Sequence, residues 1–196
     1  MPKRKTRRKT FETDFFGKPV DTVESINQKK KGNRNETVAA KWLTAWTGKD
    51  FTRTPSSGGL QWKDMSNVCG DVVCTDENFN FVFSVETKHL KDVSLPATGE
   101  LRANSKVFTI WEQCSRDAER GNKVPMLMLR RNGMGAGEYV IVLPAVVSEH
   151  FGDDAHAIST GVSKTGEALN CYRSSDIQGA DYSALADFLV KRKTIA

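Results

Sequence analysis

The stretch FNFVFSVETK, residues 79–88, decides the fold class, because an apolar β-strand pattern here ends in two charged side chains. Four apolar residues alternate onto one face of the expected strand: Phe79, Phe81, Phe83 and Val85. Side chains along a strand repeat with period two, so Glu86 and Lys88 project together from one face. This pair is either a solvated strand end or part of an active site.

A second run rich in β-formers, VCGDVVC at residues 68–74, precedes this strand, and the sequence TDEN between them is typical of a turn. We therefore expect an antiparallel hairpin in which Asp71 pairs with Ser84, with Glu86 as its diagonal neighbour. Diagonal neighbours lie about 7–8 Å apart, so the two carboxylates would be able to share one ion. A register slip of one residue would move Asp71 to the opposite face.

Asp71, Glu86 and Lys88 form a coherent chemical set if they meet on one face of the sheet. Carboxylate oxygens suit Mg²⁺, which keeps several waters and binds through a few carboxylates and substrate phosphate. A neighbouring lysine can hold or deprotonate the attacking water and offset charge on the phosphate. The set indicates metal-assisted phosphodiester hydrolysis, whereas its short motif also occurs by chance in chains without this activity.

Helical patterns flank these strands and set the fold class. A helix is expected within residues 31–48, ending at Gly48, and a second within 105–121, ending at Gly121. The buried face of the second helix is expected to carry Val107, Ile110, Trp111, Cys114 and Ala118. Further strands are expected at 50–55, 123–131 and 138–144, and a last helix at 181–193 after a less regular third. The order predicts an α/β fold with a central mixed β-sheet flanked by helices.

The bulk composition favours a soluble chain whose positive charge suits an anionic partner. The 196 residues are 38% hydrophobic and 27% charged, with a net charge of +5 and six Lys or Arg in the first ten residues. Such a basic start favours nucleic acid as a partner, although a solubilising tail explains it as well. With no membrane span or secretory signal apparent, the expected location is cytoplasmic. The four cysteines lack CxxC spacing and are read as free thiols.

We expect three regions along the chain. Residues 1–30 form a basic flexible arm, 31–145 form the core, and 146–196 form a C-terminal extension packed on the same domain. Within the core, Glu36 has two readings. The sequence NRNE makes Asn33 a helix N-cap with Glu36 reaching back to it, which the residues alone favour. Alternatively, Glu36 lies at the edge of the apolar helical stripe and looks inward along the sheet.

Taken in order, segments of residues 31–131 resemble the PD-(D/E)XK nuclease superfamily and, within it, the archaeal-type Holliday junction resolvases. The matching segments are GNRNE at 32–36, FTRTPSSGG at 51–59, GDVV at 70–73, VETK at 85–88 and the helix and strand at 111–131. The resemblance implies a restriction-endonuclease-like fold and makes 31–145 a nuclease core. It also implies Mg²⁺ as cofactor, with Mn²⁺ expected to substitute.

The resemblance also implies roles for individual residues. Asp71 and Glu86 would bind metal together with the Thr87 backbone carbonyl, and Glu36 would complete the metal shell directly or through water. Lys88 would position the attacking water, and Gln113 would help to orient Lys88. Ser57 would contact the scissile region. The candidate DNA-binding residues are Arg34, Arg53, Ser57, Lys63 and Arg116, with Arg102 and Lys106 also near the expected site.

Three functions are open at this point. The first is a metal-dependent, structure-selective endonuclease that resolves four-way junctions, as a homodimer whose two sites match the two strands to be cut. The second is a restriction- or repair-type endonuclease that acts on linear duplex or flap DNA. The third is a DNA-binding protein on a nuclease fold that does not cleave. A compact resolvase of this kind fits a phage or archaeal origin by analogy.

Overall fold

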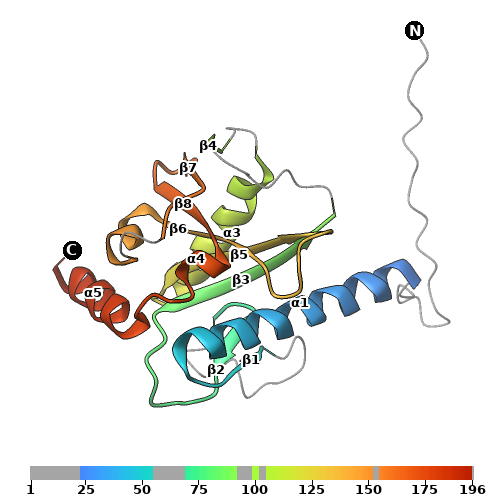
Figure 1. Ribbon diagram of the computed structural model, residues 1–196, viewed down its shortest axis with the longest axis horizontal. Helices are drawn as coiled ribbons and strands as arrows, with labels where there is room; N and C mark the ends of the chain where they lie inside the picture. The colour runs from blue at the N-terminus through green and yellow to red at the C-terminus, as the bar shows by residue number, and fades with distance from the viewer. Residues whose placement is uncertain (1–22, 55–68, 92–98, 102–104, 152–154, 196) are drawn as a thin grey trace, which may run out of the picture.

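The computed structural model describes residues 23–54, 69–91, 99–101, 105–151 and 155–195, and its centre is a six-stranded mixed sheet (Figure 1). The strand order is β3-β5-β6-β8-β7-β4. The strands are β3 (Phe83–Leu90), β4 (Gly99–Glu100), β5 (Val124–Arg131), β6 (Val140–Pro144), β7 (Ser159–Val162) and β8 (Ala168–Arg173). β3 pairs with β5 in parallel, whereas β5, β6, β8 and β7 pair successively antiparallel. The predicted central mixed sheet is therefore confirmed.

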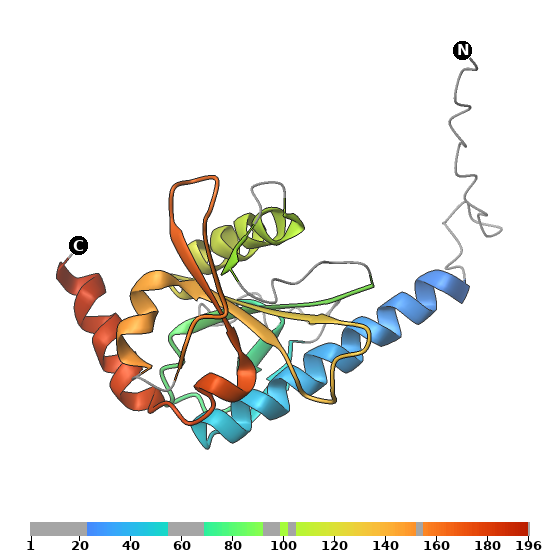
Figure 2. The same cartoon turned by 45° about the horizontal axis from the view of Figure 1, so that its top comes forward.

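Helices cover both faces of this sheet. α1 (Val23–Thr47) packs on one face against a core that includes Phe83, Val85 and Met126. α3 (Lys106–Arg120) packs on the other face, in a second core with Leu127 and Leu129. Figures 1 and 2 show the sheet lying between these two helices. Alternate residues of β5 therefore face different cores, as a strand buried on both sides requires.

α1 begins earlier than the sequence predicted. Its first residue is Val23 rather than a residue after Lys31, and it ends at Thr47, where Gly48 with φ +69° stops it as expected. The prediction of Asn33 as an N-cap is wrong, because Asn33 and Glu36 both lie inside the helix. Glu36 therefore has no capping role.

The expected hairpin between β2 and β3 is also wrong. β2 (Val72–Cys74) pairs antiparallel with β1 (Phe51–Arg53) in a separate two-stranded sheet. Instead of a ladder between β2 and β3, a parallel bridge joins Gly70, two residues before β2, to Val85 of β3. The turn sequence at 75–78 was a correct sign of a break in the strand, but the chain turns through residues 75–82 and re-enters in the same direction. Asp71 therefore does not pair with Ser84. Its N–H instead donates to the carbonyl of Val85, one residue farther along β3.

α3 confirms most of the predicted helix. Ser105 caps its N-terminus by accepting a hydrogen bond from the Val107 N–H, and Gly121 follows its last residue. Its buried residues are Val107, Phe108, Trp111, Cys114 and Ala118, so the prediction missed Phe108 and placed the half-buried Ile110 too deep. The face of α3 that bears Gln113 is thereby fixed above β3 and β5.

The C-terminal third is more regular than expected. It contains the 3₁₀ helix η1 (Ala145–His150), strands β7 and β8, the short helix α4 (Ser174–Ile177) and α5 (Tyr182–Ile195) (Figure 2). β8 lies between β6 and β7 within the central sheet, which makes residues 159–173 part of the same core. No helix in the described ranges is both long and apolar enough to cross a membrane.

All four cysteines lie in the described residues and are free thiols, as the sequence predicted.

Candidate active site

The candidate site lies at the open edge of β3, which is the outer strand of the sheet beside β5. Gly70 approaches this edge so closely that a Cβ atom placed on it would lie 2.5 Å from the Val85 carbonyl oxygen. Its φ of +88° is also a conformation that favours glycine. The Asp71 N–H donates to the Val85 carbonyl over 2.7 Å. Gly70 thus allows Asp71 to sit against β3.

Hydrogen bonds on both sides fix the position of Asp71. Its carbonyl accepts from the Thr54 N–H at 2.8 Å, and its carboxylate oxygen Oδ2 accepts from the Thr87 N–H at 2.8 Å. The Thr87 hydroxyl also donates to Oδ2, over 3.3 Å. Because the N–H and C=O of one strand residue point to the same edge, the Thr87 carbonyl faces the Asp71 side of β3. These hydrogen bonds, and not the predicted hairpin, therefore place Asp71 beside Glu86.

Glu86 and Lys88 project from β3 toward α3, as their pairing opposite Leu127 and Leu129 requires. The Glu86 carboxylate is buried, with 7% of its side chain exposed, and its Oε1 lies 2.5 Å from the Lys88 Nζ. Gln113 of α3 donates to the same oxygen over 3.5 Å. Gln113 thus contacts Glu86, which it shares with Lys88, rather than Lys88 itself.

The electrostatics of this pair reflect burial next to a second acid. Burial raises the pKa of Glu86, and the charge of Asp71 raises it further, which outweighs the lowering by Lys88. For Lys88, burial lowers the pKa, but the hydrogen bond and charge of Glu86, with the charges of Asp71 and Glu36, raise it overall. Opposite charges would lower the pKa of the acid, so the two directions conflict for an isolated pair. Burial resolves this conflict as the largest cause of the raised pKa of Glu86, with the charge of Asp71 adding to it, while the hydrogen bond and charge of Glu86 outweigh burial for Lys88.

Glu36 approaches the same edge from α1. Its Oε2 lies 3.4 Å from the Arg53 guanidinium of β1, and 18% of its side chain is exposed. Burial raises the pKa of Glu36, as does the charge of Asp71, while the charges of Arg53 and Lys88 lower it. The inward reading of Glu36 is therefore the one that the geometry supports, and Arg53 belongs to the site through it.

A divalent cation fits the donor chemistry of this edge. The charge of Asp71 raises the pKa of both Glu36 and Glu86, and a cation placed among these carboxylates would relieve that repulsion. Among the residues described, no three His, Cys, Asp or Glu side chains are grouped closely enough to hold a metal ion by themselves. Two carboxylates and the Thr87 carbonyl would leave several positions for water and phosphate oxygens, as Mg²⁺ prefers.

Of the remaining predicted residues, some are exposed on the surface and others lie outside the residues that the structure describes. Ser57, Lys63 and Arg102 lie outside the described residues. Arg34 on α1 and Lys106 and Arg116 on α3 are exposed, so they are free to meet a polyanion. Thr54 was missed, although it anchors the Asp71 main chain and its hydroxyl donates to the Gly70 carbonyl at 2.9 Å. Its only signal in the sequence was its place next to Arg53.

His89 follows Lys88 in sequence but points to the opposite face of β3, toward α1. Burial lowers the pKa of His89, and the nearby charges of Lys31 and Arg130 lower it further. His89 therefore lies near the cations Lys31 and Arg130, on the face of β3 opposite to Glu86 and Lys88.

Comparison with known proteins gives one family. The family model described as "Phage putative PDDEXK endonuclease" matches residues 27–170. Protein D14 of Escherichia phage T5 is 25% identical over 120 residues, which cover 61% of this chain and 72% of that protein. No solved structure matches. The matched range contains α1 from residue 27 onward, the Asp71 bridge, β3 and α3, and so every described residue of the candidate site.

Proposed function

This chain belongs to the phage putative PDDEXK endonuclease family, which indicates a nuclease, and we propose that it is a Mg²⁺-dependent endonuclease that resolves four-way DNA junctions. The junction preference rests on the ordered resemblance of residues 31–131 to archaeal-type Holliday junction resolvases. Mn²⁺ is expected to replace Mg²⁺.

One observation carries the hydrolytic part of this proposal: the bridge between Gly70 and Val85 brings the Asp71 carboxylate onto the Thr87 N–H. Asp71 and Glu86 thereby reach one edge of β3, with Lys88 in contact with Glu86. A buried carboxylate such as Glu86, next to the half-buried Asp71, is costly to maintain without a function, because its charge must be desolvated. This is an arrangement for binding a cation and a phosphate together.

Each residue has a task in this proposal. Asp71, Glu86 and the Thr87 carbonyl hold the metal ion, which when bound polarises a phosphoryl oxygen and acidifies a water. Glu36 contributes to its shell through water. Lys88 holds the attacking water and offsets charge on the scissile phosphate. Gln113 keeps Glu86 in position, while Ser57 contacts the scissile region and Arg53 holds Glu36.

The test compares two labelled substrates, a four-way junction and a linear duplex of the same sequence, each incubated with the full chain and Mg²⁺. We expect paired nicks in the junction and no cutting of the duplex. Equal cutting of both would replace junction resolution with the restriction- or repair-type alternative. Binding without any cutting, unchanged by Asp71→Asn, would contradict the nuclease proposal altogether.

We further propose a homodimer, because two cuts placed symmetrically across a junction call for two sites related by a two-fold axis. Analytical ultracentrifugation of the protein alone and with junction DNA measures this directly. Two protomers on one junction are expected, and a single protomer bound at saturation would contradict the dimer.

A further inference from the structure

One end of the molecule carries a concentration of cations that the proposed chemistry does not use. We call it the basic end and define it by six residues: Lys30, Lys31, Arg34, Lys91, Arg130 and Arg131. They come from the first half of α1, the residue after β3, and the last residues of β5. Segments 28–35, 88–91 and 130–132 contain no Asp or Glu. The basic end is therefore strongly positive, and Glu138 in the adjoining β5–β6 turn offsets only part of its charge.

Several contacts join the three elements of the basic end. The pairing of β3 with β5 places His89 opposite Arg130 and Leu90 opposite Arg131. The Lys31 ammonium donates to Asn132 Oδ1 over 3.0 Å, which ties α1 to the residue after β5. The Arg130 guanidinium donates to the Gly135 carbonyl at 2.8 Å and so holds the turn between β5 and β6. The cations thus sit on a braced surface.

The outer face of α3 offers a contrast. Its exposed or half-exposed charges are three cations and three acids: Lys106, Arg116 and Arg120, and Glu112, Asp117 and Glu119. Arg120 pairs with Asp117, and Glu112 pairs with Lys164 of the loop before β8. The field over α3 is close to neutral, so a polyanion is attracted to the basic end rather than to α3.

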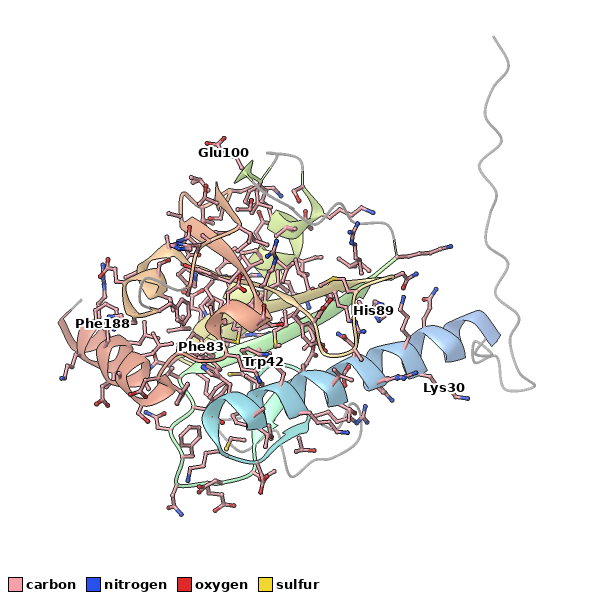
Figure 3. All side chains as sticks on the ribbon, in the orientation of Figure 1. Lys30, Trp42, Phe83, His89, Glu100 and Phe188 are labelled. Atoms are coloured by element: carbon pink, nitrogen blue, oxygen red, sulfur yellow. The ribbon has the colours of Figure 1, made fainter. Side chains whose placement is uncertain are left out.

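The basic end is continuous with the candidate site. Arg34 precedes Glu36 by two residues on α1, and Lys91, the residue after β3, follows Lys88 by three. Figure 3 shows His89 at the end of β3, over the half of α1 that carries Lys30. A nucleic-acid strand that leaves the site in this direction meets cations at once. Lys30, Arg34, Lys91 and Arg131 are all exposed and can reach its phosphates.

We propose that the basic end binds the phosphate backbone of one double-stranded limb, the limb that extends from the cleaved bond along α1. The inference rests on the proposed function. It adds the direction in which the DNA leaves the site, because the near-neutral face of α3 offers the opposite limb no comparable basic surface. Phosphate contacts of this kind position DNA without reading its sequence.

The experiment uses two triple variants with the same change in charge. The first is Lys30→Glu, Lys91→Glu and Arg131→Glu. The matched control is Lys164→Glu, Lys191→Glu and Arg192→Glu, which are exposed residues of the β7–β8 loop and α5, away from the end of β5 that carries Arg130 and Arg131. Binding of a labelled junction is measured by fluorescence anisotropy in EDTA between 50 and 200 mM salt. Thermal unfolding of each variant, within about 3 °C of the parent, verifies the fold.

The basic-end variant is expected to weaken binding at least about tenfold and to lower the salt slope by about one for each lost phosphate contact. The control should change affinity by less than about twofold. With saturating enzyme and Mg²⁺, the basic-end variant should cut within about threefold of the parent rate. Equal weakening by both variants, no weakening by the first, or a collapse of its rate at saturation would each overturn the inference.

Shortening the limbs of the junction tests the direction. Removing base pairs from one side of the cleaved bond should weaken binding of the parent protein but not of the basic-end variant. Equal sensitivity to both sides would overturn the inference. A parent protein that neither binds nor cuts DNA would instead contradict the proposed function, which keeps the two failures distinguishable.

Discussion

At the scale of single residues, the site depends on a few hydrogen bonds that fix acids at the edge of a strand. Asp71 uses its carbonyl toward β1 and its carboxylate toward β3, so both of its polar ends are engaged. Glu86 is buried with Lys88 and Gln113 on the same oxygen. The oxygens left over from these contacts are the ones available to a cation.

Replacing Glu86 with Gln should abolish cutting and spare binding. The amide keeps the shape and the contact with Gln113 but loses the charge that would hold a metal ion. We expect the cleavage rate to fall by at least about 10²-fold, with junction affinity unchanged or tighter because repulsion toward phosphate is relieved. Single-turnover cleavage and anisotropy measure the two quantities. Glu119→Gln on the exposed surface of α3 is the control, and cutting by Glu86→Gln at the parent rate would remove Glu86 from the mechanism.

The raised pKa of Glu36 predicts a pH-dependent effect on stability. Because the folded protein favours the neutral acid, the charged form at pH 8 destabilises the fold, and this cost fades as the pH falls through the raised pKa toward 4.5. Glu36→Gln should therefore raise the free energy of unfolding at pH 8 by about 0.5 kcal/mol, the scale of a single partly exposed group. The same substitution removes the ion pair between Glu36 and Arg53, and this loss offsets the gain in the free energy of unfolding only slightly.

Urea unfolding in EDTA at pH 8, 6 and 4 follows the Glu36 effect. The difference between variant and parent should be largest at pH 8 and smallest at pH 4. A difference that is constant across this range would show that the charge of Glu36 carries no cost.

At the scale of elements, the site exists because the chain just before β2 bridges to β3. β2 belongs to the small sheet with β1, and Gly70 and Asp71, which precede β2, bind to the β3 backbone at Val85. The small sheet therefore delivers one acid to the edge of the large sheet. Glu36 on α1 and Gln113 on α3 come from helices on opposite faces and meet this edge from either side.

Replacing Gly70 with Ala should both destabilise the fold and misplace Asp71. The added Cβ would meet the backbone of Val85 at 2.5–2.8 Å, and the φ of +88° adds strain. We expect a loss of about 1–3 kcal/mol and a fall in cleavage larger than the fall in stability explains. Gly166→Ala is the matched control, because Gly166 has a φ of +87° with nothing within 4 Å. If both variants behaved alike, strain alone would account for the effect and the close approach would not matter.

At the scale of the whole molecule, the C-terminal helix α5 supports the segment that leads into β3, the strand that carries Glu86 and Lys88. The Tyr182 hydroxyl of α5 accepts from the Val82 N–H at 2.9 Å and donates to the Asn80 carbonyl at 3.2 Å. Its ring packs against Phe79 and Phe81. Residues near the end of the chain thus hold the segment that leads into β3.

Tyr182→Phe should lower the free energy of unfolding by about 1–3 kcal/mol, because it leaves the buried Val82 N–H without its acceptor. The candidate site lies farther along β3, at Val85–Lys88, so the cleavage rate of the folded variant should stay within about twofold of the parent. Urea unfolding and single-turnover cleavage measure the two effects. A large loss of rate with unchanged stability would assign Tyr182 a role in the site itself.

Metal binding should stabilise the whole fold. At a metal concentration of 100 times Kd, Mg²⁺ or Mn²⁺ is expected to add about 2.7 kcal/mol to the free energy of unfolding. The raised pKa of Glu86 means that protons compete with the metal as the pH falls, so the stabilisation should shrink from pH 8 toward pH 5. Thermal unfolding with and without metal measures it, with Asp71→Asn as control. Equal stabilisation of that variant would place the ion elsewhere.

The sequence by itself determined the main elements and the chemical set. The apolar run that leads into Phe83 and Val85, the helical stripe of α3 and the stops at Gly48 and Gly121 are local signals that depend on near neighbours in the chain. The strand itself begins at Phe83, so the prediction that it includes Phe79 and Phe81 is wrong. Glu86 and Lys88 share a face wherever the strand lies, because the period of two belongs to the strand itself. The predicted acids at 36, 71 and 86 are those that the structure brings to one edge.

Only the tertiary structure decided how Asp71 reaches Glu86. A turn sequence cannot tell whether the returning strand pairs with the strand before it, and here β2 pairs with β1 and β3 with β5 instead. The choice depends on which distant apolar faces are buried together, since residues 124–131 offered β3 a partner buried on both sides. The same long-range packing placed Glu36 inside α1 with Arg53 and assembled the basic end from three separate segments. Such contacts join residues far apart in sequence, so no local pattern specifies them.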